Sequence, residues 1–169
     1  MGQTVFIGYP GCFMTAVVHK VKVFAYITHQ SRLLVFRHTD FPEAGIQVPA
    51  GTVMANEDFE TAVLREAGEE TGLHGLTIKS YLGEQIRNME DFGKDEIHHR
   101  HFYHLLCGDD PPENWLHDET DPSDGDSSPI HFEFFWAELP DQIPELIADH
   151  GIMLSMLEKR MMSPSQGMP

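Results

Sequence analysis

The stretch GTVMANEDFETAVLREAGEETGL, Gly51 to Leu73, combines the clearest helix signal of the chain with three carboxylates in the six residues from Arg65 to Glu70. The pattern predicts a helix over about residues 57–71, with Asn56 as the N-cap and acidic side chains in the first turn. Gly72 stands where helices commonly end in a left-handed residue.

The glutamates of this helix continue its apolar face instead of lying opposite it. On a helical wheel Glu66 and Glu70 fall beside Val63, and Glu69 lies at one flank. Like charges at these spacings repel by about 0.2–0.5 kcal/mol per pair, and inward-facing carboxylates need a strong partner. Arg65 is the only basic residue of the helix and cannot neutralise all three. A hard divalent cation could, because Mg²⁺ prefers oxygen ligands; the alternative is an exposed acidic helix end.

The spacing of the stretch resembles the Nudix box, G-x5-E-x7-R-E-U-x-E-E-x-G-U, in which U is usually apolar. Every fixed position is filled, with Ala67 and Leu73 at the U positions: Gly51, Glu57, Arg65, Glu66, Glu69, Glu70 and Gly72. The resemblance implies a Nudix-type α/β (α+β) fold, an α/β/α sandwich with a mixed central sheet, over residues 14–162. It also implies Mg²⁺- or Mn²⁺-dependent hydrolysis of a phosphoanhydride bond in a nucleoside diphosphate linked to another moiety.

The resemblance assigns metal binding and catalysis to the carboxylates of Glu66, Glu69 and Glu70. The backbone carbonyl of Ala50 is expected to be a further metal ligand, and one glutamate is expected also to receive a proton from water. Outside the box, Glu133 is the predicted additional ligand, with Glu96 as the second choice.

The other box residues are expected to support those carboxylates. By resemblance, Arg65 orients the neighbouring glutamates and is itself held by Glu57. Gly51 suits a place where the backbone approaches the metal and phosphate closely, and Gly72 ends the helix. An ion pair on the surface and a partner for the helix dipole are the simpler interpretations of Arg65 and Glu57.

Segments rich in β-branched and aromatic residues predict five strands, at 19–28, 33–37, 76–87, 97–107 and 130–139. Two stretches are expected to be loops, 40–51 and the acidic 108–129. The second is predicted to be a mobile surface loop, with a functional lid as the less favoured alternative.

A final helix is predicted over about 152–161, packing through Ile152, Met153, Met156 and Leu157. Residues 1–13 are expected to form an N-terminal extension and residues 163–169 a disordered tail.

Substrate phosphates require cations at the strands that border the cleft, which selects Arg37, Arg87 and Arg100. Strand alternation places His98, Arg100 and His104 on one face, and His99 and His101 on the other. A polar lining for the substrate cleft is favoured over a zinc site, because no soft ligand joins either set.

The formal charge of −16, from 11 basic and 27 acidic residues, argues against a nucleic-acid polymer or an anionic membrane as partner. No apolar run approaches the roughly 20 residues of a membrane span. The two cysteines, Cys12 and Cys107, are too few for a disulfide framework and favour a reducing, cytoplasmic location. The expected partner is a small phosphorylated substrate, and the resemblance also allows a homodimer.

The substrate remains open among nucleotide sugars such as ADP-ribose, nucleoside triphosphates and non-nucleotide diphosphates. The PAG before the box resembles the ADP-sugar branch, but Asn88 and Met89 stand where that branch often has a proline. Two alternatives of other classes are a Nudix domain that senses a nucleotide without cleaving it and a purely structural acidic domain. Sensing domains often lose box glutamates, and this sequence keeps all of them.

Overall fold

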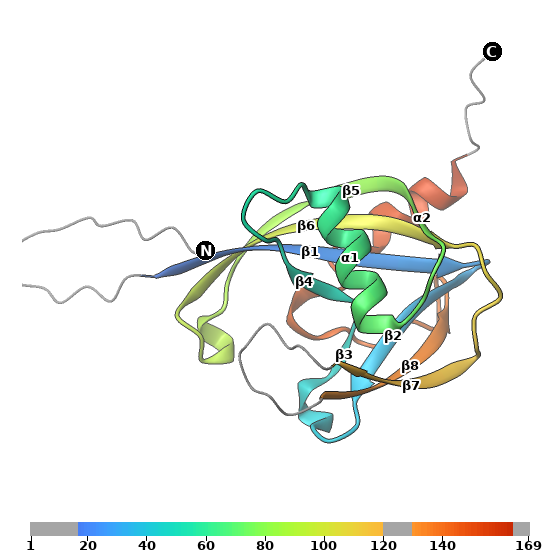
Figure 1. Ribbon diagram of the computed structural model, residues 1–169, viewed down its shortest axis with the longest axis horizontal. Helices are drawn as coiled ribbons and strands as arrows, with labels where there is room; N and C mark the ends of the chain where they lie inside the picture. The colour runs from blue at the N-terminus through green and yellow to red at the C-terminus, as the bar shows by residue number, and fades with distance from the viewer. Residues whose placement is uncertain (1–16, 120–129, 164–169) are drawn as a thin grey trace, which may run out of the picture.

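The computed structural model describes residues 17–119 and 130–163. Along the chain its elements are β1 (Val18–His29), β2 (Arg32–His38), η1 (Pro42–Ala44), β3 (Ile46–Gln47), β4 (Ala50–Thr52), α1 (Phe59–Thr71), β5 (Leu76–Asn88), η2 (Glu90–Phe92), β6 (Glu96–Cys107), β7 (Asn114–Glu119), β8 (Ile130–Glu138), η3 (Ile147–Asp149) and α2 (Leu154–Met162) (Figure 1). The predicted extension, 1–13, and all of the predicted tail beyond Ser163 lie outside the described residues.

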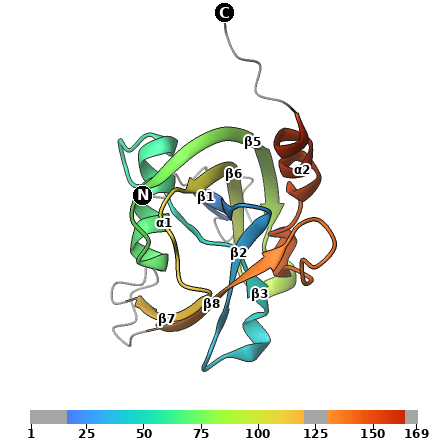
Figure 2. The ribbon, with the colours of Figure 1, turned by 90° about the vertical axis from the view of Figure 1, so that its right-hand side faces the viewer.

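The strands form one sheet in the order β5-β6-β1-β2-β8-β7, with β4 paired to β1 and β3 to β2. The β1–β6 pair is parallel and the other pairs are antiparallel, so the sheet is mixed. Figure 2 shows α1 and α2 on opposite sides of the strands. The predicted sandwich with a mixed central sheet is confirmed.

The sheet opens between its two central strands, and this opening positions the site. β1 and β2 pair only beside their connecting turn, at Thr28 with Leu33 and at His29 with Arg32. Beyond that point β1 pairs with β4, which brings Ala50 opposite Phe24. The short strand β4, in which the box begins, is thereby fixed next to the middle of β1.

Two hydrophobic clusters fill the two sides of the sheet. Alternate residues of β1 divide between them, because neighbouring side chains of a strand point to opposite faces. Val23, Ala25 and Ile27 pack with α1 through its buried Ala62 and Val63. The second cluster lies on the other face and contains Phe24, Tyr26, Phe102 and Leu157 of α2.

Helix α1 begins two residues later than the sequence predicts. The N-cap is Asp58, whose carboxylate accepts from the Thr61 N–H at 2.9 Å and from the Thr61 hydroxyl at 2.7 Å. Asn56 has φ 64° and belongs to the preceding turn, so its prediction as the N-cap is wrong. The predicted end of the helix is confirmed, since Gly72 is left-handed with φ 71° and ψ 5°.

The prediction that 108–129 is a loop is wrong for β7, which pairs with β8 over Asn114–Glu119. This strand supplies hydrogen-bond partners to the C-terminal end of α1, where carbonyl groups lack partners within the helix. Trp115 Nε1 donates to the Thr71 carbonyl at 2.8 Å, and His117 Nε2 lies 2.9 Å from the Glu69 carbonyl oxygen.

Smaller differences occur in two other segments. Residues 40–51, predicted to be a loop, contain η1 and the short strands β3 and β4. Ile152 is 47% exposed and precedes α2, so it is not part of the packing face, whereas Leu157 is fully buried. No helix in the described parts of the chain is long and apolar enough to cross a membrane.

Candidate active site

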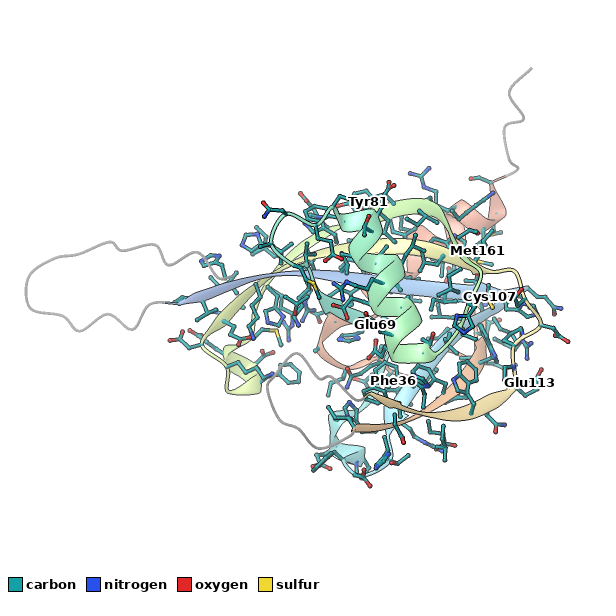
Figure 3. All side chains as sticks on the ribbon, in the orientation of Figure 1. Phe36, Glu69, Tyr81, Cys107, Glu113 and Met161 are labelled. Atoms are coloured by element: carbon teal, nitrogen blue, oxygen red, sulfur yellow. The ribbon has the colours of Figure 1, made fainter. Side chains whose placement is uncertain are left out.

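Two of the three box glutamates of α1 point into the protein. Glu66 and Glu70 are each 8% exposed, whereas the Glu69 side chain is 61% exposed. Figure 3 labels Glu69 on α1, the helix that crosses the sheet. The predicted phase of the helix is therefore confirmed, with Glu69 at its outer flank.

Gly51 of β4 lies directly against the carboxylate of Glu66. A Cβ at residue 51 would stand 1.9 Å from Glu66 Cδ and 2.0 Å from Glu66 Oε2. Only a glycine leaves room for the carboxylate in this position. The glycine that opens the box thus brings the backbone close to a box glutamate.

Ala50 faces the same carboxylates through its backbone. Its N–H donates to Glu70 Oε2 at 2.9 Å. Residues on either side of Ala50 bond to β1 instead: the Pro49 carbonyl accepts from the Ala25 N–H, and the Val53 N–H donates to the Val21 carbonyl. Because N–H and C=O of one strand residue point to the same side, the Ala50 carbonyl is directed away from β1, toward the side of Glu70.

Arg65 connects the remaining parts of the box. It forms a bidentate pair with Glu57, with Nε to Oε1 at 2.7 Å and Nη2 to Oε2 at 2.8 Å. Its Nη1 lies 2.9 Å from Glu66 Oε1 and 3.1 Å from Glu69 Oε2, and its Nη2 donates to the Thr52 carbonyl. One planar guanidinium therefore holds three carboxylates relative to β4.

The protonation equilibria of this network reflect burial and pairing. Burial raises the pKa of Glu66, although the hydrogen bond from Arg65 opposes that effect. The same guanidinium lowers the pKa of Glu57 by hydrogen bonding. In return, the hydrogen bond to Glu57 raises the pKa of Arg65.

This donor set suits a hard divalent cation. Carboxylate oxygens and a backbone carbonyl are the ligands that such ions prefer, and the absence of a side chain at Gly51 leaves the Glu66 carboxylate room on that side. As they stand, no three His, Cys, Asp or Glu side chains of the described residues converge on one point. Arg65 and the Ala50 N–H already occupy oxygens of the box carboxylates.

A cavity of about 390 Å³ adjoins the box at Ala50. Its lining comes from both sides of the opening in the sheet and from η1, η2 and η3, and includes Lys22, Phe24, Glu43, Gln47, Ala50, Met89, Phe92, Lys94, His98, Arg100, Ala148 and His150. Most of these residues were missed from the sequence. A signal existed for Lys22, which is in phase with Phe24 and Tyr26 on the inner face of β1.

The three predicted phosphate-binding arginines have different surroundings. Arg37 pairs at 2.8 Å with Glu133, its register partner on β8, so the predicted additional metal ligand is engaged by an arginine. Arg87 pairs with Asp91 at 2.5 Å and with Asp149 at 3.2 Å. Arg100 lines the cavity.

The predicted alternation of the histidine-rich strand is confirmed. Arg100, His98 and His104 are buried on one face, while His101 stacks on Phe59 of α1 at 4.1 Å between ring centroids. The second-choice ligand, Glu96, pairs with Lys20 at 2.7 Å and bonds His98 at 2.8 Å.

The family model described as NUDIX domain matches residues 18–150. The chain belongs to this family, and the match lies inside the predicted domain, 14–162. The Nudix hydrolase class predicted from the box is thereby confirmed. A comparison with curated proteins found no match.

Solved structures with this fold include three with the following similarities. A MutT NUDIX hydrolase from Burkholderia pseudomallei is 24% identical, with a TM-score of 0.56, and the match covers 82% of this chain and 98% of that one. The E. coli ORF135 protein is 20% identical, with a TM-score of 0.56 and coverages of 87% and 94%.

The third is a bifunctional NMN adenylyltransferase/ADP ribose pyrophosphatase from Francisella tularensis, complexed with AMP and a Mn ion. It is 19% identical, with a TM-score of 0.50, and the match covers 84% of this chain and 42% of that one.

Proposed function

We propose that the protein is a divalent-metal-dependent pyrophosphohydrolase that cleaves a phosphoanhydride bond in a nucleoside diphosphate linked to another moiety, such as a nucleotide sugar, or in a nucleoside triphosphate. The main support for this proposal is the pair of buried glutamates, Glu66 and Glu70. They lie against the backbone of Ala50 and Gly51, beside a cavity. Buried carboxylates of this kind are costly unless a cation or strong donors satisfy them.

In the proposed reaction Glu66, Glu69, Glu70 and the Ala50 carbonyl hold Mg²⁺ or Mn²⁺. The ion, when bound, lowers the pKa of water and neutralises charge on the diphosphate. Arg65 keeps Glu66 and Glu69 in place, and Glu57 keeps Arg65 in place. The attacking water adds to phosphorus as the P–O anhydride bond breaks, and a box carboxylate oxygen receives the proton of that water.

The structural neighbours support this proposal without fixing the substrate. The Francisella tularensis protein is a bifunctional NMN adenylyltransferase/ADP ribose pyrophosphatase in complex with AMP and a Mn ion, and another neighbour is a UDP-X diphosphatase. A small phosphorylated metabolite is therefore the proposed partner. The cytoplasmic location, the homodimer and the exclusion of nucleic-acid polymers stay predictions.

The test is incubation of the protein with Mg²⁺ and a panel of nucleotide sugars, nucleoside triphosphates and dinucleoside polyphosphates, with chromatography of the released monophosphate. Glu70→Gln is expected to lower turnover by about a hundredfold or more, because it removes negative charge from the ion site. Glu60→Gln is the matched control, since Glu60 lies on the same helix and is exposed. Tight binding of a panel member without release of any product would favour the sensing domain instead.

A further inference from the structure

Arg100 is a buried cation without a carboxylate partner. Its side chain is 1% exposed, and within residues 17–119 and 130–163 it forms no ion pair, unlike Arg37 and Arg87. Burying a charge is expensive unless it is paired. An unpaired buried cation in the wall of a cavity indicates that a ligand with negative charge pairs with it there.

One side of the Arg100 guanidinium holds the cavity wall in place. Nη1 donates to the Ala148 carbonyl and to Gln85 Oε1. Ala148 and Asp149 are both left-handed, with φ 52° and 59°, a conformation that costs about 1–2 kcal/mol per non-glycine residue. The Asp149 carboxylate is in turn bonded by Gln85 and Arg87. This turn therefore fixes the orientation of Arg100.

The other side of the guanidinium is unsatisfied. Nε is buried and has no hydrogen-bond partner among the described residues, and the one acceptor they offer to Nη2 is the Met89 sulfur, at 3.2 Å. These two nitrogens form the edge with which arginine binds two oxygens of a phosphate or carboxylate. A buried donor without a partner costs about 1–3 kcal/mol, and a thioether is only a weak acceptor.

The surroundings of this edge favour an anion. Lys22 and Lys94 line the same cavity, and Glu43 is the one carboxylate among its described lining residues, although the whole chain carries a charge of −16. Burial lowers the pKa of Arg100 to about 10, and repulsion from Arg87 adds to the effect. The guanidinium is still charged at neutral pH. The cavity therefore concentrates positive charge in an acidic protein.

We propose that the Nε/Nη2 edge of Arg100 binds a phosphoryl group of the substrate, and that the Met89 side chain covers this edge until the phosphoryl group displaces it. The choice of a phosphoryl group rests on the proposed function. Arg37 and Arg87, which are neutralised by carboxylates, are not part of this site.

Methionine suits the covering role. Its unbranched side chain adapts to changes in packing at low cost, and Met89 stands at the start of η2, where it lines the cavity. Its removal from the guanidinium would free Nη2 beside the unpaired Nε, so that two donors face the same direction. Binding of a ligand includes the free-energy cost of displacing the Met89 side chain, so Met89 lowers the affinity of the site. Groups with two acceptor oxygens offset that cost best, because they bond both Nε and Nη2.

The test measures binding without turnover, by calorimetric titration of inorganic pyrophosphate into protein in metal-free buffer. Arg100→Met is expected to weaken binding by about tenfold or more, and Arg100→Lys nearly as much, because lysine keeps the charge and loses the fork. Met89→Ala is expected to bind severalfold more tightly. Met89→Leu, which keeps a side chain over the edge, is expected not to.

Arg32→Gln is the control for net charge, because Arg32 pairs with Glu113 and does not line the cavity. Equal losses in Arg32→Gln and Arg100→Met, or no detectable pyrophosphate binding to the wild type and Met89→Ala, would overturn the proposal. So would citrate or adenosine binding as tightly as pyrophosphate. If the Arg100 variants do not fold, equal affinities of Met89→Ala and Met89→Leu overturn it.

The outcome is separable from that of the proposed function. If pyrophosphate binding depends on Arg100 but no panel member is hydrolysed, the Arg100 site is supported and the proposed hydrolase activity is refuted. If the protein hydrolyses a panel member but its affinity for pyrophosphate is unchanged by the Arg100 and Met89 variants, the proposed function stands and the Arg100 site is refuted.

Discussion

The carboxylate of Glu66 occupies the space that a side chain at Gly51 would need, because Glu66 Cδ lies 1.9 Å from the position that a Cβ at residue 51 would take. The backbone of β4 and the first inward carboxylate of α1 thus lie so close together that no side chain fits between them. Since a carboxylate is the flexible end of its side chain, it is the part that would move if the space were filled.

Gly51→Ala is therefore expected to fold and to lose most of its turnover. The added methyl group displaces the Glu66 carboxylate from Arg65, and small displacements of catalytic groups can cost about a hundredfold. The measurement is kcat at saturating Mg²⁺, together with circular dichroism to confirm folding. Wild-type turnover would mean that the position of Glu66 has no bearing on catalysis.

Gly68→Ala is the matched variant on α1. A Cβ there would meet nothing nearer than the Leu73 carbonyl oxygen at 3.8 Å, and glycine inside a helix costs about 1 kcal/mol relative to alanine. We expect Gly68→Ala to raise the free energy of unfolding by about that amount and to leave turnover unchanged. A loss of stability in urea titration would contradict the open space at this residue.

Arg65→Lys tests whether the guanidinium positions the glutamates. Lysine keeps the charge but cannot form the bidentate pair with Glu57, so we expect kcat to fall by about tenfold or more with a stability change of only about 1 kcal/mol. Arg160→Lys on exposed α2 is the control. A rise in KM alone would place Arg65 in substrate binding instead.

The sequence predicted the carboxylates of the site better than its cavity. The phase of α1 follows from residues within one helix, so the burial of Glu66 and Glu70 could be inferred from spacing alone. The cavity joins residues far apart in the chain, such as Lys22, Met89 and Ala148. Their meeting depends on strand order and on the turns η2 and η3, which local patterns do not specify.

Strand β7 shows the same limit in the fold. Its stretch is acidic and flanked by prolines, so composition favours a loop. Pairing with β8 and the contacts of Trp115 and His117 with the end of α1 outweigh that tendency. Such contacts become visible only once α1 and β8 are in place.

Metal dependence gives a further prediction. Turnover is expected to vanish in a chelator, to return with Mg²⁺ or Mn²⁺, and to return only poorly with Ca²⁺, whose coordination is longer and looser. Steady-state rates across a metal series test this, with Glu70→Gln expected to need more Mn²⁺ for half-maximal rate. Full turnover in the chelator would refute the role proposed for the box carboxylates.

His104 makes stability sensitive to acid. It is 3% exposed; its Nε2 lies 2.7 Å from Thr28 Oγ1, and its Nδ1 is buried with no hydrogen-bond partner in the part of the chain that the structure describes. Burial lowers its pKa to about 4, and the charge of Lys79 acts in the same direction. His150 behaves alike, since burial lowers its pKa to about 3.

The unfolded chain binds a proton at His104 near pH 6.5, whereas the folded protein does so only near pH 4. Between these values the unfolded state binds more protons, so the stabilisation is complete above about pH 6.5 and is lost as the pH falls. We expect His104→Gln to lose less stability than the wild type between pH 7 and pH 4, by up to about 3 kcal/mol. Urea titrations across this range measure the difference, with His74→Gln at an exposed position as the control. Parallel pH profiles for the wild type and His104→Gln would show that His104 is not buried in its neutral form.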